Sequence, residues 1–230
     1  MALLLHKEWR LNPSVPATGS LADRILAGRN FGDSCKAVFF RASLADLHDP
    51  FLLPDMKPAC DLLATAIKAR QGIAIHGDYD VDGITAAALL SRFFRRLNIP
   101  VTEIIPDRMT DGYGLTDSGV RRILATGHRL LITVDCGSAS LDEIRQLKDS
   151  GIKVIVTDHH ECQLELPAAD AVINPKRPDS LYPFRSLAGV GVALKLVQAL
   201  CAVLALGDLW QTDLELAALG TVADVVPMLD

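Results

Sequence analysis

The fold can be inferred from the segment IAIHGDYDVDG (residues 73–83), in which a short apolar run ends directly in a cluster of acids. The same arrangement recurs where LLITV (130–134) is followed by Asp135, and where VIV (154–156) precedes DHHE (158–161). Apolar runs of this length that alternate with helical patterns indicate parallel strands covered on both faces. Ligands of such sheets collect beyond the carboxyl ends of the strands, so we expect the three polar clusters to share one edge.

These patterns predict an α/β fold, with a parallel β-sheet of about five strands flanked by helices on both faces and preceded by a short, mostly helical lead-in. The predicted strands are 73–75, 101–105, 130–134, 154–156 and 171–173. The predicted helices are 56–70, 84–97, 117–126, 141–149 and 192–206, with short ones at 21–27 and 44–47. We assign the lead-in to residues 1–55 and the α/β domain to residues 56–230.

Composition narrows the class of protein. With 230 residues, half of them hydrophobic, the chain can bury one well-packed core. The net charge of -5 argues against a protein that coats duplex DNA, although acids that hold metal ions would lower the formal charge. The five cysteines form no CxxC pair, so neither a disulfide framework nor a zinc knuckle is expected. Without an export signal or a membrane-spanning run, we expect a cytoplasmic protein with no membrane partner.

The first acid cluster has the pattern of a metal site. In an extended chain, His76, Asp78, Asp80 and Asp82 would project to the same side. Carboxylates this close repel each other unless a cation lies between them, and Mg²⁺ or Mn²⁺ prefers oxygen ligands with some imidazole. A calcium loop begins in the same way, but its twelfth position would be Leu89 instead of the usual Glu. Calcium is therefore disfavoured, and a solvated acidic loop remains the alternative.

Further candidate ligands follow the later strands. Asp135 could bridge two ions, although a lone Asp at the end of a strand is usually a turn or cap residue. The adjacent His159 and His160 are unusual as core residues, which favours a functional role. Asp224 stands in an apolar segment and needs a partner there, for which a cation and a helix cap are equally good candidates.

Three segments suit phosphate binding through cationic side chains or free backbone N–H groups. They are PDRMTDGYGL (106–115), NPKR (174–177) and SLAGVG (186–191). Each is weak evidence alone, because glycine-rich turns mostly just turn the chain. The candidate residues are Arg108, Tyr113, Lys176, Arg177, Ser186, Gly189 and Gly191.

Together these motifs resemble the DHH phosphoesterase superfamily, named for the triplet found here at residues 158–160, and within it the RecJ-type single-stranded-DNA exonucleases. The resemblance extends from about Gly72 to Asp230. Its motifs are HGDYDVDG from residue 76, PDRMTDGYGL from 106, TVDCG from 133, VTDHHE from 156, NPKRPDSLYPFRSLAGVGVA from 174 and GTVADVVP from 220.

The resemblance implies two divalent cations, Mn²⁺ or Mg²⁺, and a role for each ligand. One ion would be held by His76, Asp80 and Asp135. The other would be held by Asp82, Asp135, His159 and Asp224. Asp135 would bridge the ions, and Asp78 would belong to the same cluster as a ligand or a neighbouring acid. His160 would contact the scissile phosphate, and Asp158 would orient its neighbours. Catalytic roles would thus fall to Asp78, Asp135 and His160.

The implied activity is 5′→3′ degradation of single-stranded DNA to mononucleotides, in DNA repair and recombination. Members of this type continue into a DHHA1 domain and usually an OB-fold, so we expect this chain to be the N-terminal catalytic portion, with those domains as its partners. A helicase and a single-strand-binding protein are further candidate partners. Two alternatives stay open: a phosphoesterase of short oligonucleotides or cyclic dinucleotides, and a non-catalytic DNA-binding remnant.

Overall fold

The computed structural model describes residues 10, 12–29, 31–32, 36, 39–41 and 43–228. It divides into two compact units, Met1–Leu47 and His48–Asp230. The described part of the first unit contains helix α1 (Leu21–Gly28) and a 3-10 helix, η1 (Leu44–Asp46). Each begins at a serine whose hydroxyl accepts a backbone N–H, which is a common way to start a helix. The expected helical character of the lead-in is confirmed.

The second unit is built on a five-stranded, all-parallel sheet with the strand order β2-β1-β3-β4-β5. The strands are β1 (Ile73–Gly77), β2 (Val101–Ile104), β3 (Leu130–Val134), β4 (Lys153–Thr157) and β5 (Ala171–Ile173). The helices are α3 (Met56–Lys68), α4 (Val81–Arg96), α5 (Asp117–Ala125), α6 (Leu141–Asp149), α7 (Gly189–Leu204) and α8 (Leu214–Ala223), with 3-10 helices η2 (Pro50–Leu52) and η3 (Gly207–Asp213).

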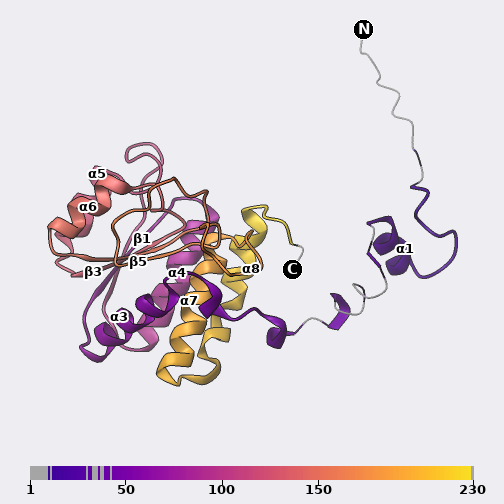
Figure 1. The fold of residues 1–230 in the computed structure, drawn as a ribbon, viewed down its shortest axis with the longest axis horizontal. Coiled ribbons are helices and arrows are strands. Elements are labelled where there is room, and N and C mark those ends of the chain that lie inside the picture. The colour runs from indigo at the N-terminus through magenta and orange to yellow at the C-terminus, as the bar shows by residue number, and fades with distance from the viewer. Residues whose placement is uncertain are drawn as a thin grey trace, which may run out of the picture. The chain divides into compact units, whose positions relative to one another are not determined.

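Helices cover both faces of this sheet, as expected (Figure 1). Successive residues of a strand point to opposite faces. Ile73 and Ile75 of β1 are therefore buried against α3, α4 and α7, whereas Ala74 between them is buried on the side of α5 and α6. The α/β class is confirmed, and no helix among the described residues is long and apolar enough to cross a membrane.

The α/β unit begins earlier in the chain than residue 56, where the sequence pattern placed its start. Helix η2 packs against α7, and Leu53 is buried in the main core. Asp55 accepts a hydrogen bond from the backbone N–H of Val172 in β5. Residues 48–55, which the sequence placed in the lead-in, are thus part of the packed unit.

Helix α8 was not predicted. Its apolar residues surround the helix, so the sequence lacks the one-sided periodicity that marks a surface helix. In the structure α8 packs against α4 and α7. This packing matters for function because α8 ends at Ala223, one residue before Asp224.

Candidate metal centre

The acids converge because three neighbouring strands end in register. Gly77, Val134 and Thr157 pair side by side across β1, β3 and β4. The next residue of each strand is an acid, and these acids are Asp78, Asp135 and Asp158. All three are buried. The expectation that the polar clusters share one edge of the sheet is therefore confirmed for these positions.

Side chains of seven residues form three overlapping groups whose ligand atoms lie within 4.8 Å of one another in each group. The groups are Asp78, Asp80 and Asp135; Asp82, His159 and Asp224; and Asp135, His159 and His160. Asp135 belongs to two of them, and so does His159. The three groups are therefore linked into one cluster, through Asp135 and through His159.

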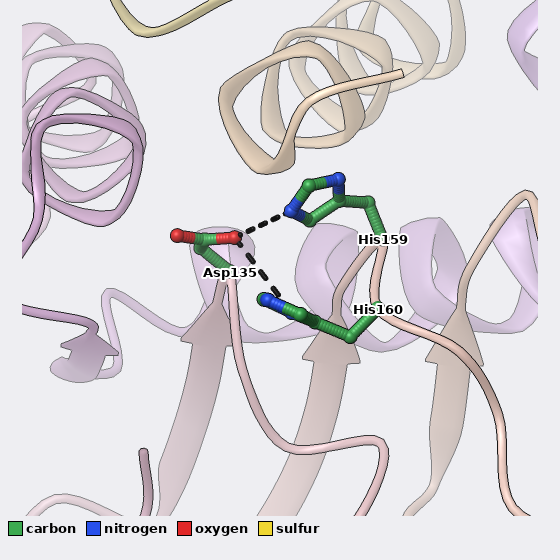
Figure 2. Close-up of side chains that lie close together, drawn as sticks. All are labelled: Asp135, His159 and His160. Atoms are coloured by element: carbon green, nitrogen blue, oxygen red, sulfur yellow. Dashed lines mark ion pairs between the residues drawn. The ribbon is translucent and has the colours of Figure 1, made fainter. Parts of the chain in front are cut away.

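Asp135 is at the centre of the cluster. Its backbone has a φ of 59°, a left-handed conformation that Asp tolerates better than most residues and that often marks functional sites. Its Oδ1 accepts no hydrogen bond from the described residues. Nε2 of His159 lies 3.0 Å from this oxygen, and Nδ1 of His160 lies 4.0 Å from it (Figure 2).

The surroundings of this carboxyl disfavour its ionised form. Burial, followed by the negative charges of Asp82 and Asp80, raises the pKa of Asp135 to about 10. Burial also raises the pKa of Asp78, and no hydrogen bond to its Oδ2 is found in the described part of the chain. A divalent cation would restore the ionised forms of both groups by supplying the missing positive charge.

Asp82 is fixed in place by a helix that is distant in the sequence. Its Oδ2 accepts the N–H of Gly189 at 2.5 Å, and its Oδ1 accepts the N–H of Val190 at 2.8 Å. These two N–H groups begin α7, where the helix dipole favours a negative charge. Burial raises the pKa of Asp82, and the two hydrogen bonds oppose that shift.

Asp80 and Asp224 enter the cluster from two helix ends. Asp80 is the N-cap of α4, where its Oδ1 accepts the N–H of Gly83 at 2.9 Å, and its side chain is exposed. Asp224 follows α8 and lies with Oδ2 3.7 Å from Nδ1 of His159. The other ring nitrogen of His159 is 3.8 Å from Asp82. His159 therefore lies between these two carboxylates.

Two glycines let the helices approach the carboxylates. A Cβ at Gly189 would come within 2.6 Å of Oδ1 of Asp135, and one at Gly220 within 2.9 Å of Oδ1 of Asp82. Both distances are too short for a real side chain. The sequence analysis quoted Gly220 only as part of a motif; nothing in the sequence alone places this residue of α8 against Asp82.

His160 is held between two neighbours. Its Nδ1 lies 2.8 Å from Oδ1 of Asp158, and its Nε2 lies 2.8 Å from the hydroxyl of Tyr113. The hydrogen bond to Asp158 raises the pKa of His160. Burial alone would raise the pKa of Asp158, but hydrogen bonds from His160 and from the backbone N–H of Ser138 outweigh it and lower that pKa to about 2. Asp158 is therefore an ionised, orienting carboxylate.

Two polar residues, Asn174 and Ser138, hold the loop of Asp158 and His160 in place, and the sequence did not predict this role. The side-chain amide of Asn174 donates to Oγ of Ser138 at 3.0 Å and to the carbonyl of His160 at 2.9 Å. The backbone N–H of Ser138 donates to Asp158 at 2.8 Å. Asn174 appeared in the sequence only within a phosphate-binding segment, and Ser138 carried no signal at all.

His76 is not brought to the cluster. The chain leaves the extended conformation after β1, so the expected alternation does not continue from His76 to Asp82. The ring is fully buried, and its Nε2 faces Gly119 in the first turn of α5. Burial and the charge of Arg122 lower the pKa of His76 to about 4, which keeps the imidazole neutral. It belongs to none of the three groups found among the described residues.

Arg177 was expected to bind phosphate, but its guanidinium is paired with other residues of the chain. Its guanidinium lies 2.6 Å from Asp55 and 2.7 Å from Asp179, and it also donates to the carbonyl of Val172. Because the side chain is buried and fully paired, it anchors β5 and the start of the α/β unit. We correct its role to a structural one.

The glycine-rich segment also differs from expectation. The N–H of Gly189, proposed to bind phosphate, donates to Asp82 instead. Gly191 is buried inside α7, next to Leu187. Ser186 is half-buried in the loop before the helix. This segment positions a carboxylate and offers no free pair of N–H groups at Gly189 and Val190.

The three remaining candidates are on accessible loops. Arg108 is exposed and lies 5.5 Å above the ring of Tyr79. Tyr113 is also exposed. Lys176 is half-buried, with Nζ 3.2 Å from Glu161. Of the three, Tyr113 contacts His160 directly.

The donor set fits hard divalent cations. It consists of carboxylate oxygens with imidazole nitrogens. Two buried carboxylate oxygens, in Asp78 and Asp135, accept no hydrogen bond from any residue that the structure describes. Oxygen-rich sites of this kind suit Mg²⁺ and Mn²⁺. The residues that would hold the ions are Asp78, Asp80, Asp82, Asp135, His159 and Asp224.

Comparison with known proteins is consistent with this geometry. The family model described as the DHH family, N-terminal domain, matches residues 72–221. The single-stranded-DNA-specific exonuclease RecJ of Bacillus subtilis is 43% identical over 211 residues, covering 91% of this chain and 26% of that protein. RecJ of Haemophilus influenzae is 37% identical, covering 98% of this chain and 40% of that protein.

Solved structures agree. A crystal structure of exonuclease RecJ bound to manganese superposes with a TM-score of 0.70 at 37% identity, covering 76% of this chain and 44% of that one. RecJ of Thermus thermophilus in complex with Mn²⁺ gives a TM-score of 0.66 at 36% identity, covering 76% of this chain and 25% of that one. The chain thus spans less than half the length of these relatives.

Proposed function

Because the chain belongs to the DHH family, we propose that it is the N-terminal catalytic portion of a two-metal-dependent nuclease that degrades single-stranded DNA from its 5′ end to mononucleotides. The relatives at 37–43% identity that are named as single-stranded-DNA-specific exonucleases support this activity. The single observation that carries it is Asp135, a buried carboxylate shared between two candidate ligand groups.

Two divalent cations would be held by the ligand residues named above, and they would lower the pKa of a water and neutralise charge on the phosphate. Asp135 would bridge the ions, with Asp78 and Asp80 on one side and Asp82, His159 and Asp224 on the other. We do not extend this role to His76, whose ring faces α5.

The protein's own groups would position the phosphodiester. Asp158 orients the His160 ring through Nδ1, so Nε2 is directed away from Asp158 and toward the place now occupied by the Tyr113 hydroxyl. We infer that His160 contacts the scissile phosphate at this nitrogen. Arg108 and Lys176, on neighbouring loops, are suited to hold phosphates further along the strand.

Further domains, a cellular location and partner proteins also belong to the proposal. Since the chain spans only part of its relatives, we infer that a DHHA1 domain and an OB-fold complete the DNA-binding surface. A cytoplasmic location, a role in DNA repair and recombination, and partnership with a helicase or a single-strand-binding protein fit a nuclease of this kind.

The test compares substrates and one variant. Mn²⁺-loaded chain is incubated with a 5′-labelled single strand, the matching duplex, a dinucleotide and a cyclic dinucleotide. With wild type we expect labelled mononucleotide as the first product from the single strand and little product from the duplex. The variant Asp135→Ala should release no product from any substrate. As a control, Asp142 on α6 has an exposed side chain, and the variant Asp142→Ala should cleave the single strand as fast as wild type. Cleavage of only the short substrates would favour the oligonucleotide phosphoesterase, and binding without cleavage would favour the non-catalytic module.

A further inference from the structure

A cavity of about 240 Å³ adjoins His160 and Asp158. Three loops at the carboxyl edge of the sheet form its walls. They contribute residues 113–115, 136–140 and Glu161, and helix α6 adds Glu143. The cavity therefore adjoins the candidate metal cluster at His160, which lines it, whereas Asp78, Asp80, Asp82, Asp135, His159 and Asp224 do not.

The walls of this cavity are hydrogen-bonded to the loop that carries Asp158 and His160. Ser138 lines the cavity and donates its backbone N–H to Asp158, the same carboxylate that orients His160. Asn174 links Ser138 to the carbonyl of His160. The position of the cavity relative to His160 is therefore fixed by hydrogen bonds, as a preformed ligand site requires.

The lining favours a neutral ring with N–H donors over a phosphate. Asp158, Glu143 and Glu161 surround the cavity with carboxylates, which repel phosphate oxygens. Glu161 is paired with Lys176, but no ion pair of Glu143 is found among the described residues. Tyr113 adds an aromatic ring to the wall. Carboxylates that accept hydrogen bonds, together with an aromatic surface, suit a nucleobase.

We propose that this cavity is a nucleobase subsite for a nucleotide next to the scissile phosphate, with Glu143 accepting a hydrogen bond from the edge of the base. This inference rests on the proposed function, because it assumes that His160 contacts a DNA phosphate. The cavity is smaller than the roughly 300–1,000 Å³ of sites that enclose drug-sized ligands, so it suits one ring system and leaves the sugar and phosphate outside.

The carboxylate gives the subsite a preference among bases. Cytosine presents an amino group at the position where uracil presents a carbonyl oxygen. A carboxylate accepts from the amino group and repels the carbonyl. We therefore expect cytosine to be bound more tightly than uracil, by roughly two- to tenfold, which is the usual range for one net hydrogen bond.

The test measures binding of three phosphate monoesters to the Mn²⁺-loaded full chain by calorimetry. The ligands are dCMP, dUMP and 2-deoxyribose 5-phosphate, none of which contains a phosphodiester to cleave. We expect dCMP to bind on the order of tenfold more tightly than the sugar phosphate, because base stacking is lost in the latter. We also expect dCMP to bind more tightly than dUMP.

Two variants and a control locate the effect. Glu143→Gln should abolish the difference between dCMP and dUMP, and Ala139→Phe, at the cavity wall, should reduce dCMP binding to the level of the sugar phosphate. Asp142→Asn removes the same charge one residue away, from an exposed side chain paired with Arg145. It should leave all three affinities unchanged.

The outcomes separate the subsite from the proposed function. Equal binding of dCMP and 2-deoxyribose 5-phosphate would overturn the subsite alone, since the metal-dependent phosphate site would still be present. A cytosine preference that survives both Glu143→Gln and Ala139→Phe would place the base elsewhere and also overturn it. Failure of every monoester to bind in the presence of Mn²⁺ would overturn the proposed function and the subsite together.

Discussion

Gly189 lies directly against Asp135: a Cβ at this glycine would be 2.6 Å from Oδ1 and 2.7 Å from Cβ of the acid. The N–H of the same glycine donates to Asp82. One residue of α7 therefore sets the positions of two carboxylates that come from different elements. This close approach links the start of α7 to the proposed metal site.

Replacing Gly189 should accordingly disrupt metal binding. In Gly189→Ala the added methyl must displace Asp135 or the start of α7, and overpacking of this kind costs about 1–3 kcal/mol of unfolding free energy. We expect Mn²⁺ affinity measured by calorimetry to fall by at least tenfold. Gly191→Ala is the matched control, because its Cβ would meet only the flexible Leu187 side chain, at 3.1 Å. Unchanged Mn²⁺ affinity in Gly189→Ala would show that α7 does not position the ligands.

Asp135→Asn should separate metal binding from folding. Asn has nearly the same shape as Asp. The raised pKa of Asp135 favours the neutral, protonated carboxyl in the absence of metal, so the neutral amide is a close substitute. The metal-free variant should therefore unfold within about 1 kcal/mol of wild type. Wild type should gain about 2.7 kcal/mol at Mn²⁺ one hundredfold above its dissociation constant, and the variant should gain almost none. The readout is the melting temperature with and without Mn²⁺; equal Mn²⁺ stabilisation of both proteins would remove Asp135 from the site.

Arg177→Met tests the corrected role of that arginine. The change leaves Asp55 and Asp179 without their shared cation. The two acids are 37% and 62% exposed, so the cost should be smaller than for a fully buried pair, about 1–3 kcal/mol for the lost hydrogen bonds. We expect a clear loss of urea stability and, below the unfolding transition, unchanged affinity for an oligonucleotide. Normal stability with weakened oligonucleotide binding would instead support the original expectation.

The buried amine of Lys195, which is not a candidate metal ligand, should make the stability of the fold depend on pH. Its amine lies 2.7 Å from the carbonyl of His48 and 3.0 Å from Gln198, and burial lowers its pKa to about 8. Since unfolded lysine titrates near 10.4, the folded state prefers the neutral amine. The stability from this group is fully present above about pH 10.4 and is lost as the pH falls through about 8.

Lys195→Met removes this dependence. The unfolding free energy of wild type minus that of the variant should therefore rise between about pH 8 and pH 10.4, by at most a few kcal/mol. Urea titrations at closely spaced pH values measure this difference directly. A difference that stays constant or falls over this interval would mean that the amine is charged in the folded protein.

The sequence predicted the sheet because its physical signals are local. Short apolar runs mark the buried strands, and β3 and β5 begin and end where they were expected. The acids were found because parallel strands must end at a common edge. Helix α8 was missed because it is apolar on all sides, so its packing against α4, rather than its periodicity, makes it helical.

Contacts between distant segments account for what the sequence could not predict. Alternation suggested His76 as a ligand, but the turn after Gly77 directs the chain differently and leaves the ring under α5. The backbone N–H of Gly189 was expected to bind a phosphate, but it donates to the carboxylate of Asp82. Arg177 was expected to meet phosphate and is instead paired with Asp55. Only the tertiary structure identifies these partners.

The presence of paired cations around Asp135 can be tested most directly with crystals soaked in Mn²⁺. An anomalous difference map should contain two peaks that share Asp135, one next to Asp80 and the other next to Asp82, His159 and Asp224. No peak at these carboxylates, or peaks that avoid Asp135, would contradict the two-metal account.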